Sequence, residues 1–418
     1  RIGHKRLFLA GLPVFAVASL CAAFSPTAEW LIAARVFLAV GAAMMMPATL
    51  SIVRHVFTDE RERALAIGIW ASVASGGAAI GPVVGGLLLE YFWWGSVFLI
   101  NVPVVLLVWP LAWKLIPRCG GDNPRPADIV GSVQIMIGLV GAIYALKELS
   151  KPAPDLSALL AAALIGILFL VLFVRRQQRS AHPMIDFSLF RNRLFAGGIG
   201  VALLSMVALI GVELVLSQRL QLVLGLSPLQ AALFILPIPL ASALAGPMAG
   251  LLLPRYGERS IILGGFVLTA FGIAGLALWY QSSMAPQLVS LALVGFGLGG
   301  VITAASTAIM LNAPEEKSGM AASIEDVSYE LGGVLGVTLL GGLMTAVYSH
   351  SLALPVSDLA YDSIDEALRL AAGMAADRAQ QLTQLARLAF DRAFITVLIA
   401  AALLMALGAG VVKLALRK

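Results

Sequence analysis

The chain has 418 residues, of which 60% are hydrophobic and only 12% are charged, and its mean hydropathy is +0.94. A water-soluble globule of this length and composition would expose large apolar areas, so the composition predicts an all-α integral membrane protein. The net charge of +5 comes from basic residues dispersed over many loops. This dispersion excludes the single basic face that nucleic-acid binding needs.

Twelve segments are apolar and long enough to cross a bilayer, which takes about 20 residues. In chain order the expected spans are 7–25, 30–53, 65–89, 95–116, 129–147, 156–174, 195–217, 228–253, 260–280, 287–311, 321–348 and 393–415. Alternate loops differ in charge, because one set collects most of the basic residues, whereas the short loops of the other set hold only Lys147, Lys151 and Arg219. The positive-inside rule therefore predicts that both ends of the chain are cytoplasmic and that the lipid bilayer surrounds the spans.

The chain opens on the basic sequence RIGHKRLFL, which contains Arg1, Gly3, Lys5 and Arg6. A basic stretch before a span is also what the positive-inside bias alone would produce. The pattern resembles the second half of the loop signature that joins helices two and three in the major facilitator superfamily. The resemblance implies that these four residues belong to a conserved cytoplasmic loop motif.

Arg35 lies several residues inside the second apolar segment, in LIAARVFLAVGAA. Charge is costly at such a position and usually marks a functional site or a fixed internal pair, although an arginine near the end of a span can also snorkel to the interface. Its spacing to the small residues at 41–43 resembles the second motif of the same superfamily. That resemblance implies a role for Arg35 in proton transfer, but Leu38 and Ala39 stand where the motif usually has Gln and Gly.

The third expected span carries Gly77, Gly81, Pro82, Gly85 and Gly86 in the sequence GAAIGPVVGG. Glycines four residues apart allow close helix packing, and the proline removes a backbone hydrogen bond and bends the helix axis. Ordinary packing through small residues would account for two of the glycines, but not for five residues in register. The stretch matches completely the G-x-x-x-G-P-x-x-G-G signature of major facilitator antiporters, which implies a role in gating.

Three further stretches resemble the fourteen-helix drug:proton antiporters of that superfamily, namely YFWWGSVFLINVP (91–103), QLVLGLSPLQAAL (221–233) and EDVSYELGGVLG (325–336). The first departs from the usual Trp-Arg-Trp, with Trp94, Gly95 and Ser96 at those places, and is similar to the methyl-viologen-resistance branch. The resemblance covers the whole chain. It implies proton-coupled efflux of lipophilic cations or quaternary ammonium compounds by alternating access, across the cell inner membrane.

An internal repeat supports this architecture from the residues alone. The sequence GLLLPRYGERS carries Arg255 and Gly257 at an offset of 254 from their counterparts at the start of the chain, and Gly332 to Gly336 repeats the first step of the glycine motif at an offset of 255. Eight spans separate the copies, as expected for two six-helix bundles with two inserted helices. Because the loop motif follows helix two in the family, we expect the chain to hold helices 3–14 and to lack two preceding spans.

These assignments divide the chain into four parts. They are the remainder of the N-terminal bundle (1–116, helices 3–6), the inserted helices 7 and 8 (117–174), a cytoplasmic linker (175–194) and the C-terminal bundle (195–418, helices 9–14). The last part includes a polar extracytoplasmic loop at about 349–392. Its Ala-rich sequence predicts a pair of short amphipathic helices outside the membrane.

A cation exporter that exchanges protons needs acids inside the membrane. Glu213 lies within the apolar sequence LLSMVALIGVELVLSQ, and the alternative to a coupling role is an ion pair with Arg219. Glu325, Asp326 and Glu330 form a second acidic group.

On a helix, Asp326 and Glu330 lie on one face, while Glu325 stacks with Tyr329 on a neighbouring face. Close carboxylates in a low-dielectric site favour retention of a proton that a cation can displace. The alternative is that Glu325 and Asp326 lie in the cytoplasmic headgroup layer, which makes the deeper Glu330 the preferred coupling residue.

The sequence contains no phosphate-binding loop, no Ser/His/Asp set and no clustered metal ligands. We therefore expect no enzyme activity, no catalytic residue, no metal and no cofactor, and we expect a monomer whose substrates are small cationic drugs and protons. Two alternatives remain at this stage. One is a proton-coupled transporter of another small organic solute, and the other is a membrane enzyme or a structural membrane component.

Overall fold

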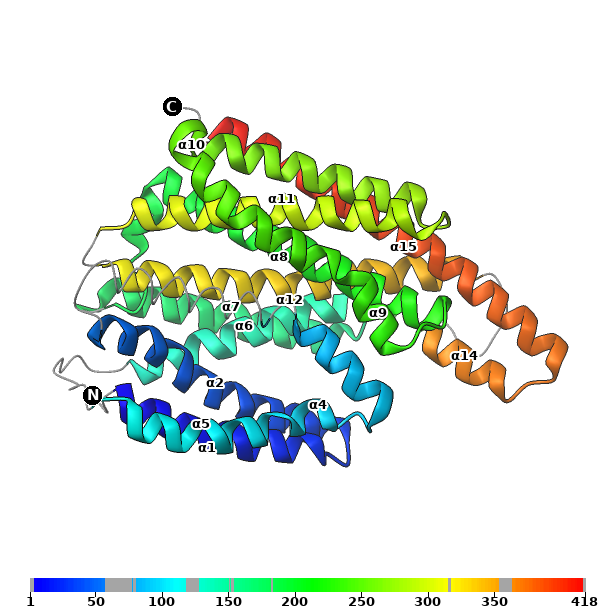
Figure 1. The fold of residues 1–418 in the computed structure, drawn as a ribbon, viewed down its shortest axis with the longest axis horizontal. Helices are drawn as coiled ribbons and strands as arrows, with labels where there is room; N and C mark the ends of the chain where they lie inside the picture. The colour runs from blue at the N-terminus through cyan, green and yellow to red at the C-terminus, as the bar shows by residue number, and fades with distance from the viewer. Residues whose placement is uncertain are drawn as a thin grey trace. The chain divides into compact units, whose positions relative to one another are not determined.

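The computed structural model describes residues 4–56, 77, 80–117, 128–149, 151, 154–181, 183–314, 317–352 and 363–415. Within these ranges the chain is helical almost throughout and forms no strand (Figure 1). Its internal contacts define two compact units, one of residues 1–127 with 227–233 and the other of residues 128–226 with 234–418. Both units are bundles of apolar helices.

The first unit contains α1 (His4–Ala23), α2 (Ala28–Val56), a short apolar helix Ile80–Tyr91, α4 (Ser96–Leu99) and α5 (Asn101–Leu115). Helix α1 packs against both α2 and α5. The crossing of α1 and α2 is close because Gly41 has no side chain: a Cβ there would lie 2.8 Å from the backbone nitrogen of Phe15. Small residues in membrane helices commonly allow such close backbone approach.

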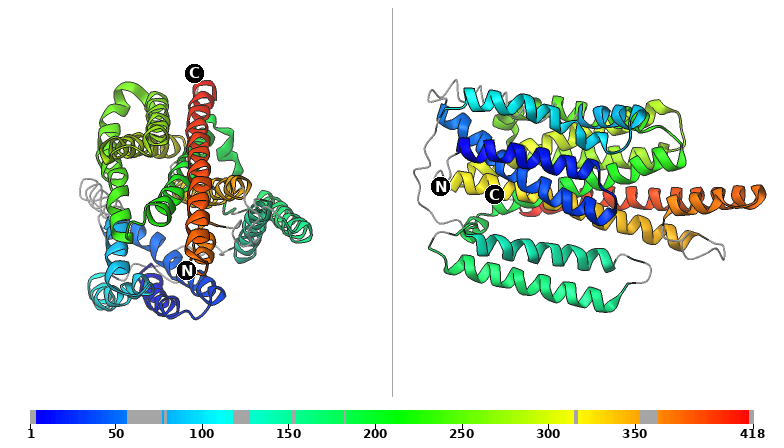
Figure 2. Two further views of the ribbon diagram at one scale, coloured as in Figure 1. Left: turned by 90° about the vertical axis from the view of Figure 1, so that its right-hand side faces the viewer. Right: turned by 90° about the horizontal axis from the view of Figure 1, so that it is seen from below.

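The second unit begins with α6 (Ile129–Leu149) and α7 (Leu156–Arg179), which Figure 2 shows as an antiparallel pair. The Asp155 carboxylate caps the start of α7 by accepting hydrogen bonds from the backbone N–H groups of Ser157 and Ala158. The 3₁₀ turn η1 (Phe187–Arg191) then leads into α8 (Arg193–Gln218).

After α8 come the π-helical turn η2 (Arg219–Val223), α9 (Pro228–Ile235) and α10 (Pro237–Trp279). Then follow α11 (Met284–Leu311), α12 (Ser318–Ser351), α14 (Ile364–Ala372) and α15 (Ala376–Ala415). Helix α10 packs along α11 and α15, and α8 packs along α12 (Figure 1). These contacts place α8, α10, α11, α12 and α15 in one bundle.

Gly257 divides α10 into two parts. Its φ of +72° and ψ of 162° are not helical, and the left-handed φ is one that only glycine adopts at little cost. The break lies between the predicted spans 228–253 and 260–280. The 43 residues of α10 are therefore two membrane segments joined at this glycine.

Ten helices among the described residues are long and apolar enough to cross a membrane, and one of them, Pro228–Trp279, contains both segments of the bent helix. The predicted span 65–89 lies largely outside the described residues, and its described end belongs to the helix Ile80–Tyr91. The prediction of an all-α multi-pass membrane protein is confirmed.

The predicted pair of short helices in the loop 349–392 is only partly correct. The first is α14, capped by Ser363, whose hydroxyl accepts a hydrogen bond from the backbone N–H of Glu366. The second is not a separate helix, because α15 runs without a break from Ala376 into the last span. The sequence between residues 376 and 407 contains neither Gly nor Pro, and therefore has no residue that would end the helix.

Candidate functional site

Glu325 is the buried acid of α12, with 5% of its surface exposed. The Tyr329 hydroxyl, one turn further along, donates a hydrogen bond of 3.0 Å to its Oε1, which confirms the predicted contact between these two residues. Because the Glu325 carboxyl group is buried in the bundle and accepts this hydrogen bond, its position is well defined and its access to water is limited.

Asp326 and Glu330 are both exposed, and they lie one turn apart on α12. This arrangement agrees with the predicted common face. The structure thus separates the acidic group into one enclosed carboxyl, that of Glu325, and two accessible ones.

Glu213 is half-buried on α8, and among the described residues no hydrogen bond or ion pair to its carboxylate is recorded. The register of the packed helices shows how far it lies from Glu325. Helices α8 and α12 are parallel, and their contacts pair Val207 of α8 with Gly336 of α12, and Gly211 of α8 with Leu340 of α12. Glu213 of α8 is therefore level with Gly342 of α12. At 1.5 Å per residue, Glu213 and Glu325 are about 25 Å apart along the helix axes.

Arg219 does not pair with Glu213, so the alternative ion pair considered from the sequence is wrong. Arg219 is 3% exposed, and its Nε donates a hydrogen bond of 3.0 Å to Oδ1 of Asp391 on α15. Its guanidinium also lies 4.9 Å from the ring centroid of Tyr280 and 5.3 Å from that of Phe394. These contacts join η2, directly after α8, to α15 and to the end of α10.

Sequence reasoning missed Asp391 as a partner, although a signal was present. Asp391 is the last acid before the apolar sequence AFITVLIAAALLMALGAG of the final span. A charge that must lie at a membrane-embedded helix end needs a partner of opposite sign. Arg219, at the end of another span, was the available cation.

Arg35 is exposed on α2, and no ion pair or hydrogen bond with a described residue is recorded for it. The nearby Gly41 has a packing role at the crossing of α1 and α2.

The glycine motif shows one close contact among the described residues. A Cβ on Gly86 would lie 2.8 Å from Cα of Leu229 at the start of α9, whereas a Cβ on Gly77, Gly81 or Gly85 would meet nothing within 4 Å. Pro82 is exposed. The other three glycines leave a helix surface without close neighbours in the described part of the unit.

The repeat of the glycine motif in the second unit, Gly332 and Gly336, is closely packed. A Cβ on Gly336 would lie 2.5 Å from the carbonyl oxygen of Val207, and one on Gly332 would overlap the carbonyl of Leu203. Both glycines therefore allow α12 to approach the backbone of α8.

The loop motif and its repeat make equivalent contacts. Lys5 donates hydrogen bonds to the carbonyl oxygens of Trp113, at 2.8 Å, and of Ile116, at the end of α5. Arg259, at the same offset of 254 residues, donates from Nη2 to the carbonyl oxygen of Lys413 near the end of α15, at 2.7 Å. A cation near the last carbonyl groups of a helix is favourable for the helix dipole.

The other residues of the loop motif and of its repeat have different surroundings. Arg6 and Arg255 are exposed, and the guanidinium of Arg255 lies 5.5 Å from the ring centroid of Tyr256. Gly257 forms the break in α10. Arg1 and Gly3 lie outside the described residues.

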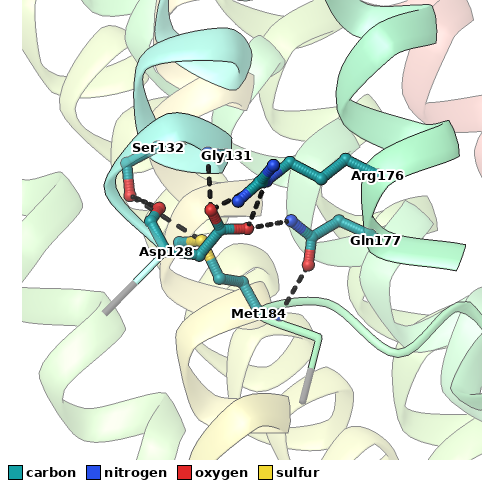
Figure 3. Close-up of polar contacts among 6 residues, drawn as sticks. All are labelled: Asp128, Gly131, Ser132, Arg176, Gln177 and Met184. Atoms are coloured by element: carbon teal, nitrogen blue, oxygen red, sulfur yellow. Dashed lines mark hydrogen bonds and ion pairs between the residues drawn. The ribbon is translucent and has the colours of Figure 1, made fainter. Parts of the chain in front are cut away.

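A polar cluster around Asp128 joins the start of α6 to the end of α7 (Figure 3). Its carboxylate accepts hydrogen bonds from the backbone N–H of Gly131 (2.9 Å), from Arg176 Nε (2.9 and 3.1 Å) and from Gln177 Nε2 (2.9 Å). These bonds, that from Gly131 first, lower the pKa of Asp128 below its ordinary value. Gln177 in turn accepts a hydrogen bond of 2.6 Å from the backbone N–H of Met184.

Apolar spans, a glycine break between paired helices and the carboxyl group of Glu325 buried within the bundle are typical of a polytopic membrane transporter. A family model described as "Major Facilitator Superfamily" matches residues 1–337 and 201–411. The chain belongs to the major facilitator superfamily.

Two curated relatives match almost the whole chain. The "Methyl viologen resistance protein SmvA" of Salmonella typhimurium is 43% identical over 397 residues, which are 93% of this chain and 80% of the relative. The "Multidrug efflux pump LfrA" of Mycolicibacterium smegmatis is 40% identical over 426 residues, covering 100% of this chain and 84% of the relative.

Among solved structures, a bacterial homologue of the human lysosomal transporter Spinster, in an inward-facing and unoccupied conformation, matches with a TM-score of 0.62. Its sequence identity is 15%, and the match covers 99% of this chain and 83% of that one. A peptide transporter of the POT family matches with a TM-score of 0.61 at 15% identity, over 99% of this chain and 80% of that one. Likeness at this level of identity supports the fold alone.

Proposed function

We propose that this protein exports lipophilic cations, including bis-cationic and quaternary ammonium compounds, in exchange for protons. The two relatives at 43% and 40% identity are described as a methyl viologen resistance protein and a multidrug efflux pump. The observation that supports the proton-coupled part is Glu325, a carboxyl group 5% exposed in an apolar bundle, with Tyr329 as its hydrogen-bond partner. An intramembrane acid of this kind can hold a proton or balance the charge of a bound cation.

The acids have different roles in this proposal. Glu325 exchanges its proton toward the cytoplasm, and Glu213 receives protons near the outer end of α8. The two acids are about 25 Å apart along the helix axes, which is too far for a proton to pass directly from one to the other. Proton uptake at Glu213 and proton release at Glu325 are therefore linked through a change of conformation. Asp326 and Glu330, both exposed and one turn apart, are suited to attract the cation.

The remaining elements serve alternating access. Arg35 contributes to the proton path in the first unit, and the glycine motif from Gly77 to Gly86 supplies a helix surface for movement during gating. We further propose that the protein is a monomer in the cell inner membrane, with both chain ends cytoplasmic and without enzymatic activity or a cofactor.

The test is exchange of methyl viologen for protons in proteoliposomes that contain the full-length protein. An imposed pH gradient should drive uptake of labelled methyl viologen into vesicles whose interior is acidic. Glu325→Gln should abolish this uptake and leave gradient-free counterflow of the cation in place. Glu366→Gln on α14 is the matched control, because Glu366 lies outside the spans and its nearest cation is Arg369, 3.8 Å away.

Uptake that is equally driven by the gradient in Glu325→Gln and Glu213→Gln would contradict the proposed coupling. Absence of methyl viologen transport, together with proton-driven accumulation of another organic solute, would favour the alternative transporter. Chemical conversion of the cation without net transport would favour a membrane enzyme.

A further inference from the structure

The segment from Pro183 to Arg191 connects the inserted helices to the C-terminal bundle and lies against the first turns of α12. Its Asp186 carboxylate accepts a hydrogen bond of 2.5 Å from Nζ of Lys317, the residue that precedes α12. The backbone N–H of Asp186 is 3.2 Å from the sulfur of Met320, at the first turn of the same helix. One residue of the segment therefore makes two contacts with the start of α12.

An apolar layer continues this contact into the bundle. Leu189 of η1 is 5% exposed and belongs to a buried cluster with Ala321 and Ile324 of α12. The cluster also contains Phe195 of α8 and Ile309 of α11. Movement of η1 would therefore disturb the packing of the first two turns of α12 against its neighbours.

The same cluster reaches the candidate proton site. Tyr329 packs against it, and the Tyr329 hydroxyl donates the hydrogen bond to Glu325. The contacts thus run from Asp186 through Leu189 and Ile324 to the residue that orients the Glu325 carboxyl. A contiguous set of packed side chains and hydrogen bonds of this kind can transmit a change in position.

The other end of the segment is also fixed. The backbone N–H of Met184 donates to Gln177, which is 2% exposed and donates in turn to Asp128 (Figure 3). The segment is therefore attached at one end to the inserted helix pair and at the other to α12. A connection that served only as a flexible linker would not need both attachments.

We propose that the Asp186–Lys317 ion pair is a positioning contact, through which the segment 183–191 holds the first turns of α12 and the carboxyl of Glu325 in place for proton exchange. This inference rests on the proposed function. Asp186 and Lys317 touch neither proton nor cation in the transport step. Hydrogen bonds, that from Lys317 first and those from Ser188 next, lower the pKa of Asp186 to about 2, so its carboxylate stays charged wherever the transporter operates.

The experiment compares Asp186→Asn, Lys317→Met and the exchanged pair Asp186→Lys/Lys317→Asp in the full-length protein. Both single variants should lower the turnover of proton-driven methyl viologen transport about 2- to 30-fold, with little change in the apparent KM for the cation. Both should also shift the midpoint of the pH profile by about 0.5 unit or more in the same direction. The exchanged pair should restore turnover and midpoint toward wild type.

Arg369→Gln is the matched control, because Arg369 pairs with Asp365 at 2.9 Å on the exposed surface of α14. It should change neither the turnover nor the pH midpoint. Lys317→Arg keeps the charge and should resemble wild type. It tests the need for a positive charge at this position if Lys317→Met fails to fold. Wild-type turnover and pH midpoint in both single variants, or failure of the exchanged pair to recover in well-folded protein, would overturn the proposal.

Amide hydrogen exchange separates this inference from the proposed function. Loss of the ion pair should speed exchange in the first three turns of α12 and leave the centre of α11 unchanged. If exchange speeds up there while Glu325→Gln transports normally, the positioning contact stands and the proton role of Glu325 is wrong. If exchange in α12 does not change, the positioning contact is wrong whatever the role of Glu325.

Discussion

At the scale of single residues, Arg219 and Asp391 illustrate how charge is accommodated inside this chain. The side chain of Arg219 is 4% exposed and that of Asp391 is 17% exposed. Removing a charge from water is costly, and here the cost is offset by the hydrogen bond to Asp391 and by the faces of Tyr280 and Phe394. Such a pair contributes little relative to apolar side chains, but either partner alone is strongly unfavourable.

This balance predicts non-additive effects on stability. Asp391→Asn should destabilise the protein by about 3 kcal/mol, because it leaves the Arg219 guanidinium buried without a counter-charge. The double variant Arg219→Leu/Asp391→Leu should lose much less than the sum of the two single losses. Unfolding of the purified protein in mixed detergent micelles would measure the three free energies, and simple additivity would contradict this account.

The pKa of Asp186 predicts a pH dependence of stability with a definite sign. Its pKa falls from 3.8 to about 2 through its bond with Lys317, so the pair stabilises the folded state above the ordinary pKa and loses this effect as the pH falls toward 2. The difference in thermal midpoint between wild type and Asp186→Asn should be constant from about pH 5 to pH 8 and shrink below about pH 4. A difference that grows on acidification would contradict it.

At the scale of helices, close approach is set by the glycines of α12. Gly332 and Gly336 bring α12 against the backbone of α8, and this register defines the levels of Glu213 and Glu325. Small residues are the usual means of such contact in membranes, where apolar side chains gain little by leaving lipid. The distance between the two acids is therefore a consequence of helix packing.

Gly336→Ala should destabilise the protein by about 1–3 kcal/mol, because the new methyl group would lie 2.5 Å from the carbonyl oxygen of Val207. Gly333→Ala is the control on the same helix. Its methyl group would meet only Cγ1 of Ile210 at 3.5 Å, an ordinary contact, and alanine favours the helix. Thermal denaturation should show a lower midpoint for the first variant alone, and equal midpoints would refute the packing argument.

At the scale of the whole molecule, both units contain the same kind of contact, in which a basic side chain binds carbonyl groups at the end of a helix. Lys5 binds carbonyl groups at the end of α5, and Arg259, 254 residues later, binds a carbonyl near the end of α15. Each basic residue thus contacts the end of one helix of its own unit, α5 or α15.

Lys5→Met and Arg259→Met should each weaken one helix end by about 0.3–1 kcal/mol. Hydrogen exchange should become faster at the end of α5 in the first variant and at the end of α15 in the second. Because the two contacts lie in different units, the effects in the double variant should add. Loss of protection at both helix ends in either single variant would contradict independent contacts.

The sequence by itself determined the membrane class, the superfamily, the repeat and the separation of spans at Gly257. These features depend on local composition and on spacing along the chain, both of which a single sequence displays. It also determined that Glu325 and Tyr329 meet, because residues four apart on a helix are neighbours.

Only the tertiary structure decided which acid is enclosed and which acid pairs with Arg219. From the sequence, Glu330 was preferred to Glu325, and Glu213 was the available partner for Arg219. The structure buries Glu325 beside Tyr329, leaves Glu330 exposed, and pairs Arg219 with Asp391 of α15. Burial and ion pairing depend on which helix faces pack together. The charges of Arg219 and Asp391 at the edges of apolar stretches indicate that each needs a partner, but their spacing of 172 residues does not show that they meet.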